Sequence, residues 1–104
     1  MEKKLAILMT VHNRKDKTER CLSSLYKCIL PEGYELNVFL VNDGCTDGTA
    51  NAIEELFPYV KIIQGSGNLY WNRGMRLAWQ TATHTYDFDY YVWLNDDVYC
   101  IRLR

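Results

Sequence analysis

The sequence predicts an α/β fold, a Rossmann-like parallel sheet with βαβαβαβ order. Short continuous apolar runs, typical of strands buried on both faces, alternate with longer stretches whose apolar residues recur at helical spacing. Strands separated by such helices form a parallel sheet that helices cover on both faces. Right-handed crossovers between the strands then give a Rossmann-like arrangement. No repeat or internal linker interrupts the pattern, so residues 1–104 are expected to form a single domain.

The first half of the chain is predicted to supply a strand, a helix and a second strand. Residues 5–11 form the first apolar run. The helix is expected over residues 16–29, because Asp16 can cap it and Glu19 follows in capping-box spacing. One face of this helix is apolar through Leu22, Leu25 and Ile29. After a break, residues 36–41 form the second apolar run and predict the second strand.

The second half repeats this alternation. A second helix is expected to begin at Thr46 or Asp47 and to end at Pro58. The remaining elements are a strand, a loop, a helix and a strand over residues 60–63, 65–68, 71–82 and 89–94. The last helix is expected to bury Met75, Ala78, Trp79 and Ala82.

The fourth predicted strand is apolar along its length, from Tyr90 to Leu94. Such a run indicates a strand that is buried on both faces. If its edge is left uncovered, this composition favours pairing with another chain. We therefore expect the isolated chain to expose apolar surface and to form a homo-oligomer.

Composition excludes several classes of protein. Of the 104 residues, 48% are apolar and 24% charged, as in an ordinary soluble domain. The net charge of −1 gives no electrostatic reason to expect nucleic acid as a partner. No apolar run approaches the roughly 18 residues of a membrane span, and the first run is too short for a signal peptide. The four cysteines lack zinc-ligand spacing. A cytoplasmic protein is therefore expected.

Two acidic segments follow apolar runs: V-N-D-G-C-T-D-G-T at 41–49 and V-W-L-N-D-D-V at 92–98. Ligands bind at the carboxyl ends of strands in open α/β sheets, and carboxylates there are costly unless they are used. Asp96 and Asp97 are expected to serve a ribose hydroxyl and a divalent cation, or else to end the strand in a solvated turn. Asp43 is expected to accept a base N–H, although N-D-G is also a turn signal.

Further polar residues follow other strand ends. Thr10, His12 and Arg14 close the first predicted strand and can line the same crevice. Arg14 and Arg73 are candidate contacts for a base or diphosphate, the alternative being solvated side chains. His12 has no candidate nucleophile beside it in sequence, so a structural role competes with a catalytic one. Trp71 is expected either to stack on a sugar or base, or to pack in the core.

Together these segments resemble the family 2 glycosyltransferases with the GT-A fold. The resemblance runs from Leu5 to about Val98. It includes T-V-H-N-R, C-L-S-S-L, V-N-D-G-C-T-D-G-T, G-N-L-Y-W-N-R-G-M-R-L-A and L-N-D-D-V, in this order. Each segment alone is weak, but five in this order and spacing are specific.

The resemblance implies a nucleotide-sugar donor and a Mn²⁺ or Mg²⁺ cofactor. Because Asp43 can accept the N3–H of uracil or thymine, a UDP- or dTDP-linked donor is expected. Thr10 and His12 would border the base, and Asp43 would hydrogen-bond it. Arg73 would lie near the base or diphosphate. After the fourth predicted strand, Asp96 would face the ribose and Asp97 would ligate the metal. Asn95 would be a neutral metal ligand. Asn95 takes the first place of the family's D-x-D motif, which is N-D-D here.

The resemblance also implies what the chain does not supply. Family members are usually more than twice this length, and their catalytic base and acceptor site follow the D-x-D strand. We therefore expect residues 1–104 to be a truncated donor-binding portion, with residues 99–104 as a truncation tail and the base beyond Arg104. The expected reaction is inverting transfer to a glycan or lipid-linked acceptor in polysaccharide synthesis, at the inner face of the membrane. This portion alone is expected to be inactive.

Two other hypotheses compete with this one. A metal-dependent nucleotidyltransferase would share the sheet and the metal, but would carry a glycine-rich basic loop after its first strand. The corresponding H-N-R-K-D-K-T is not glycine-rich. A non-catalytic interaction module would pair with a partner chain and bind no nucleotide.

Overall fold

Four parallel strands form one sheet in the computed structural model, which describes residues 3–27 and 33–95. The strand order is β3-β2-β1-β4. In chain order the elements are β1 (Lys3–Val11), α1 (Lys15–Lys27), β2 (Tyr34–Asn42), α2 (Thr49–Leu56), β3 (Lys61–Gln64), α3 (Tyr70–Thr85) and β4 (Tyr90–Trp93). The predicted α/β class, the βαβαβαβ order and the parallel sheet are confirmed. No helix of the described residues is long and apolar enough to cross a membrane.

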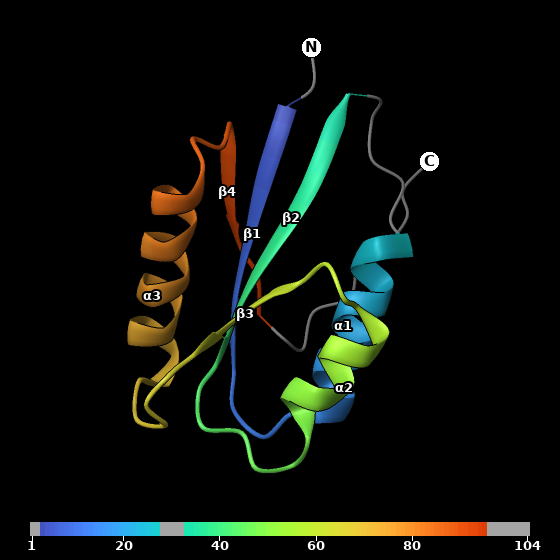
Figure 1. Cartoon of the computed structure of the whole chain (residues 1–104), viewed down its shortest axis with the longest axis vertical. Helices are drawn as coiled ribbons and strands as arrows, with labels where there is room; N and C mark the ends of the chain where they lie inside the picture. The colour runs from blue at the N-terminus through green and yellow to red at the C-terminus, as the bar shows by residue number, and fades with distance from the viewer. Residues whose placement is uncertain (1–2, 28–32, 96–104) are drawn as a thin grey trace.

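Helices cover both faces of the sheet, with α3 on one side and α1 and α2 on the other (Figure 1). Alternate residues of β1 therefore enter two separate cores. Ile7, Met9 and Val11 pack with the α1 and α2 side, while Ala6 and Leu8 pack with the α3 side. This double burial is the physical reason why the central strands are apolar without interruption.

The two central strands are longer than the two at the edges. β1 and β2 pair over nine residues, from Lys3 with Tyr34 to Val11 with Asn42. β4 pairs only with residues 5–8 of β1, so its last residue, Trp93, lies beside Leu8. The carboxyl end of β1 therefore extends beyond β4, and Leu94 and Asn95, which follow β4, lie next to this extension.

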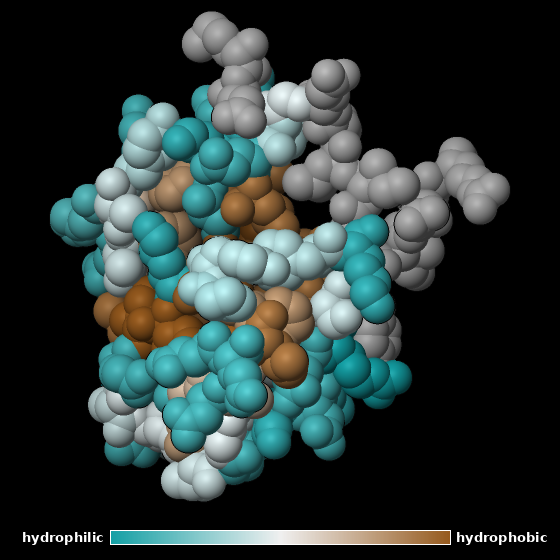
Figure 2. Space-filling model, turned by 45° about the vertical axis from the view of Figure 1, so that its right-hand side comes forward, coloured by the Kyte–Doolittle hydropathy of each residue, from teal (hydrophilic) through white to brown (hydrophobic). Residues whose placement is uncertain are grey.

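Both edge strands leave apolar side chains partly uncovered. In β3, Ile62 and Ile63 are half-buried. Figure 2 shows apolar atoms between polar ones at mid-height, the level at which Figure 1 places β3. In β4, Tyr90 and Trp93 are 50% and 48% exposed. The apolar surface that this strand is expected to expose is present, because β4 has only β1 as a described neighbour. Self-association stays a prediction.

The starts of α1 and α2 also differ from the prediction. α1 begins at Lys15, and the Arg14 carbonyl accepts the first helical N–H, from Thr18, at 2.8 Å. Asp16 therefore lies inside the first turn and is not the cap. A carboxylate there still interacts favourably with the positive end of the helix dipole. α2 begins at Thr49, because Gly48 precedes it with a left-handed φ of 83°. The start predicted at Thr46 or Asp47 was too early.

The buried face of α3 differs from the prediction at one residue. Met75, Ala78 and Ala82 are buried as expected, but Trp79 is 44% exposed and Gly74 is buried instead. A Cβ at Gly74 would lie 2.1 Å from the Thr10 hydroxyl oxygen. Gly74 therefore lets α3 approach β1 closely at the carboxyl end of the sheet. Trp79 lies farther along the helix, where it packs edge-on against Trp93 of the short edge strand.

Candidate functional site

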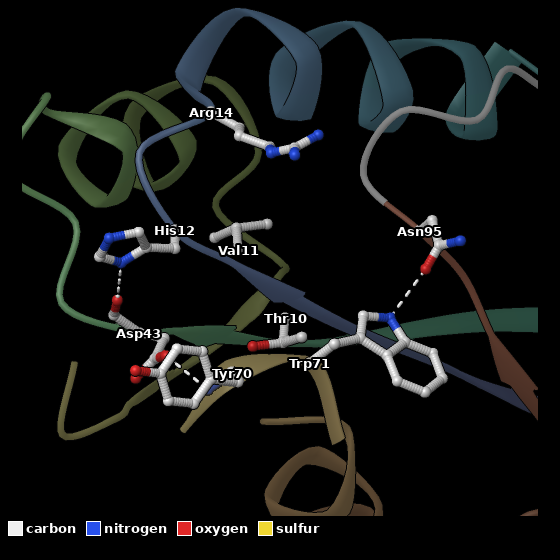
Figure 3. Close-up of a pocket in the computed structure, with 8 residues that line it drawn as sticks. All are labelled: Thr10, Val11, His12, Arg14, Asp43, Tyr70, Trp71 and Asn95. Carbon is white, nitrogen blue, oxygen red and sulfur yellow. Dashed lines mark hydrogen bonds between the residues drawn. The ribbon is translucent and has the colours of Figure 1, made fainter. Parts of the chain in front are cut away.

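A hollow of about 280 Å³ lies at the carboxyl end of β1 (Figure 3). Its walls come from the end of β1 and the following loop, the residue after β2, the first turn of α3 and the second residue after β4. The lining residues are Thr10, Val11, His12, Arg14, Asp43, Tyr70, Trp71 and Asn95. The structure thus brings together five predicted site residues from three strand ends, and Trp71 with them.

Two groups of predicted residues lie elsewhere. Arg73 is exposed on the first turn of α3 and is not among the lining residues. Asp96 and Asp97 lie outside the described residues, so their predicted contacts stay predictions. Conversely, the sequence arguments assigned no role to Tyr70, which lines the hollow. Its signal was its position directly before Trp71 in the segment that opens α3.

Asp43 is 4% exposed, and its carboxylate is the acceptor for the start of α3. Oδ1 accepts the Gly67 N–H at 2.7 Å, while Oδ2 accepts those of Leu69 at 3.1 Å and Tyr70 at 3.2 Å. The first N–H groups of a helix have no partner within it, and a carboxylate there is a strong acceptor. Asp43 thus fixes α3 to the end of β2. Two carboxylate oxygens offer about four acceptor positions, so capacity for another donor remains.

The loop after β2 and the loop before α3 are pressed together around this carboxylate. A Cβ at Gly44 would lie 2.7 Å from the Cα of Gly67, and both residues have positive φ, 69° and 97°. Only glycine meets both requirements without strain. The predicted turn at N-D-G is therefore present, and it also serves to bring the Asp43 carboxylate to the α3 backbone.

His12 is oriented by the main chain of the same residue. Its Nδ1 lies 2.5 Å from the Asp43 carbonyl oxygen (Figure 3). A carbonyl oxygen only accepts, so Nδ1 carries the proton and donates it. Nε2 is then the ring nitrogen left for other contacts. His12 thus has the structural hydrogen bond that was considered as an alternative to a catalytic role, and its ring also lines the hollow.

Charge in the hollow is divided between two residues. Among the lining residues, Arg14 is the cation and Asp43 the anion. Figure 3 shows the Arg14 side chain on the α1 side of the hollow, across from Thr10, Tyr70 and Trp71. Arg14 and Asp43 therefore place opposite charges on different sides of the hollow.

The model of glycosyl transferase family 2 matches residues 6–102. The chain belongs to this family. Its fold is also found in solved structures. TarS from S. aureus in complex with UDP-GlcNAc has a TM-score of 0.72 and 21% identity, covering 91% of this chain. The mannosyltransferase PcManGT from Pyrobaculum calidifontis, in complex with GDP-Man and Mn²⁺, has a TM-score of 0.68 and 22% identity, covering 93% of this chain.

These likenesses show the GT-A fold for this family 2 chain. The chain spans only part of the matched structures, 26% of the TarS chain and 28% of the PcManGT chain. A comparison with curated proteins found no match. The predicted family and fold are thus confirmed, and the family favours the glycosyltransferase hypothesis over the two alternatives.

In this family 2 chain the residue at the first place of D-x-D is held by α3. The Trp71 indole N–H donates to Asn95 Oδ1 at 2.8 Å (Figure 3). Trp71 is 45% exposed, so it is a wall of the hollow and not a core residue. Within residues 3–27 and 33–95, no group of three or more His, Cys, Asp or Glu side chains could hold a metal ion.

Proposed function

We propose that the hollow binds the nucleotide-diphosphate part of a sugar donor, and that the chain is the donor-binding portion of a glycosyltransferase. The observation that carries this proposal is the convergence of Thr10, His12 and Asp43 with Trp71 and Arg14 at the carboxyl edge of a GT-A sheet. Nucleotides bind at this edge in open α/β folds. Two structural neighbours are complexes with UDP-GlcNAc and GDP-Man, which supports a donor of this class.

Each lining residue has a role in this proposal. Thr10 and the oriented His12 ring border the base. The remaining acceptor capacity of Asp43 receives the N3–H of uracil or thymine, so we propose a UDP- or dTDP-sugar. Arg14 faces the diphosphate, because its guanidinium suits phosphate oxygens. Arg73 is proposed to reach the diphosphate from outside the hollow.

The proposed cofactor is Mn²⁺ or Mg²⁺. Such ions take one or two carboxylates together with phosphates and water. Within the described chain the donor set does not fit a complete site, because Asn95 is a neutral amide whose oxygen already accepts the Trp71 N–H. Asp97 is therefore the proposed ligand, with Asp96 directed to the ribose. Bound there, the metal would stabilise charge on the leaving diphosphate.

The catalytic base and the acceptor are also proposals. Asp43 is the one carboxylate among the lining residues, and its hydrogen bonds to α3 make it unsuited to take a proton from an acceptor. We propose that the base lies beyond Arg104. Inverting transfer to a glycan or lipid-linked acceptor, a role in polysaccharide synthesis, and a cytoplasmic place at the membrane face rest on the family resemblance alone.

The test is a thermal-shift panel of UDP, dTDP, GDP and ADP, each with Mn²⁺. Ligand at about 100 times its dissociation constant stabilises a fold by roughly 2.7 kcal/mol. We expect the largest shifts with UDP and dTDP. Equal shifts with all four would contradict the proposed base preference. No shift with any of them would contradict the donor site itself and favour the interaction module.

A further inference from the structure

We infer that Trp71 is a positioning residue that holds Asn95 as a hydrogen-bonding wall of the donor hollow and not as a metal ligand. This inference rests on the proposed function. It concerns the one place where the chain departs from the family's D-x-D pattern, the asparagine at its start.

The chemistry of the contact fixes how Asn95 is turned. An indole nitrogen is a donor only, so its partner at 2.8 Å must be the amide oxygen of Asn95. The amide NH₂ group is then directed away from the indole. Phosphate and ribose oxygens accept hydrogen bonds from such a group, whereas an aspartate at this position offers no donor. A nucleotide oxygen that reaches this amide nitrogen would contact Asn95 without a metal between them.

The same contact makes Asn95 a poor metal ligand. The indole hydrogen already occupies one lone pair of the amide oxygen, and it carries a partial positive charge. A cation on the remaining lone pair would lie beside that hydrogen and be repelled by it. A neutral amide also attracts a divalent cation less than the carboxylate that it replaces.

Trp71 is fixed well enough to act in this way. Its ring packs edge-on against Trp93, with centroids 5.7 Å apart and planes at 62°. Such aromatic pairs contribute beyond the area that they bury. Gly74, one turn along α3, sets the helix close against Thr10 of β1. The indole is thus held by its own helix, by the end of β4 and by Asn95.

Trp79 provides a matched control on the same helix. It is 44% exposed, against 45% for Trp71, and packs edge-on against the same Trp93 at 5.9 Å. It does not line the hollow, and no hydrogen bond is described for its indole within the described residues. Trp79→Phe therefore removes comparable aromatic packing without touching Asn95.

The first experiment titrates UDP, with and without Mn²⁺, into the whole chain and its variants. Trp71→Phe keeps a ring and loses the donor, and Asn95→Ala loses the acceptor. We expect each to weaken binding about three- to tenfold, as for one hydrogen bond, both with and without Mn²⁺. The double variant should bind no more weakly than the weaker single one. Trp79→Phe should bind as the wild type does.

Two results would overturn the inference. A loss at Asn95→Ala that requires Mn²⁺ would make Asn95 a metal ligand. An equal loss at Trp79→Phe would reduce Trp71 to packing. Asn95→Asp sharpens the choice, since it keeps an acceptor for Trp71 but replaces the amide donor with a charge. We expect Asn95→Asp to bind UDP more weakly than the wild type without Mn²⁺. If residue 95 were a metal ligand, Asn95→Asp would instead bind UDP more tightly than the wild type when Mn²⁺ is present.

A second measurement needs no nucleotide and so separates this inference from the proposed function. The indole N–H signal of Trp71, identified by its loss in Trp71→Phe, should be protected from hydrogen exchange. It should shift in Asn95→Ala and stay unchanged in Trp79→Phe. A signal that exchanges freely in the wild type would overturn the contact, whatever the chain binds. A protected signal in a chain that binds no nucleotide would contradict the donor site and the placement of Asn95 in it.

Discussion

The dipeptide Asn-Asp occurs at the end of an apolar run twice in this chain, and the asparagines of the two copies lie in different surroundings. Asn42 and Asp43 end the central strand β2 and are 7% and 4% exposed. Asn42 accepts the Cys45 N–H at 3.1 Å and donates to Gln64 at 3.3 Å. Asn95 follows the edge strand β4, is exposed, and is held by Trp71. The first copy is thus a structural junction in the middle of the sheet, whereas the asparagine of the second copy is an accessible wall at its edge.

The difference comes from neighbours and not from the dipeptide. β2 has β1 and β3 beside it, and the loops that follow these strands converge on Asp43. β4 has only β1 as a described neighbour and is shorter than it. A buried polar group needs a partner within the protein, whereas an exposed one can be satisfied by water or a ligand.

The largest expected effect is at the buried copy. Asp43→Ala leaves the N–H groups of Gly67, Leu69 and Tyr70 without their acceptor. Each unsatisfied buried donor costs about 1–3 kcal/mol, so we expect the free energy of unfolding to fall by about 3 kcal/mol. Urea unfolding measures it. Asn95→Ala is the control and should change stability by no more than about 0.5 kcal/mol. Equal losses at both positions would break the comparison.

The next effect tests the close approach of α3 to β1. In an unhindered helix, Gly74→Ala would stabilise by about 1 kcal/mol. Here the new methyl group meets Thr10, and we expect a net loss of about 1–3 kcal/mol by urea unfolding. Adding Thr10→Ala removes two of the three atoms in the way and should restore part of the loss. A Gly74→Ala variant more stable than the wild type would show that the approach is looser.

A binding effect is expected at Asp97, which follows the second Asn-Asp copy in the sequence. Asp97→Asn should weaken UDP binding only when Mn²⁺ is present, because the base contacts stay intact. Even groups that merely support a metal ligand cost about tenfold when lost, so a loss of at least that size is expected. Calorimetric titration with and without Mn²⁺ measures it. The same loss in the absence of metal would assign Asp97 a structural role like that of Asp43.

The smallest effect concerns Asp47, whose carboxylate is exposed like Asn95 but accepts hydrogen bonds from the protein like Asp43. The Thr49 hydroxyl, and more weakly the Lys15 N–H, hold the pKa of Asp47 below its usual value. A carboxyl group whose pKa is lower in the folded than in the unfolded chain stabilises the fold at pH values above its ordinary pKa of about 3.9. This stabilisation is lost as the pH falls through the pKa of the folded state. Asp47→Asn should therefore lower stability slightly at pH 7, and the difference should vanish on acidification.

Urea unfolding of Asp47→Asn and wild type at pH 7 and at about pH 3 measures this difference. Glu54→Gln, on the exposed side of α2, is the control. A difference that grows on acidification would have the wrong sign for a depressed carboxyl pKa.

The sequence predicted the order of the elements and most of the site, because both depend on local pattern. Thr10, His12 and Asp43 each follow or end an apolar run, and such positions converge in a parallel sheet. The burial of Trp79 was mispredicted for a different reason. Helical spacing indicates which side chains share a face, but not what that face packs against. Trp79 packs against Trp93 of the edge strand β4 and stays 44% exposed.

The hold on His12 has a further consequence. Its partner is the main-chain oxygen of residue 43, which every amino acid supplies. The side chain at that position can therefore change without removing the acceptor that orients the imidazole. A replacement at residue 43 that still accepts the N–H groups before α3 would therefore alter the contact with a base while His12 keeps its orientation. The orientation of His12 thus depends on the main chain of residue 43 and not on its side chain.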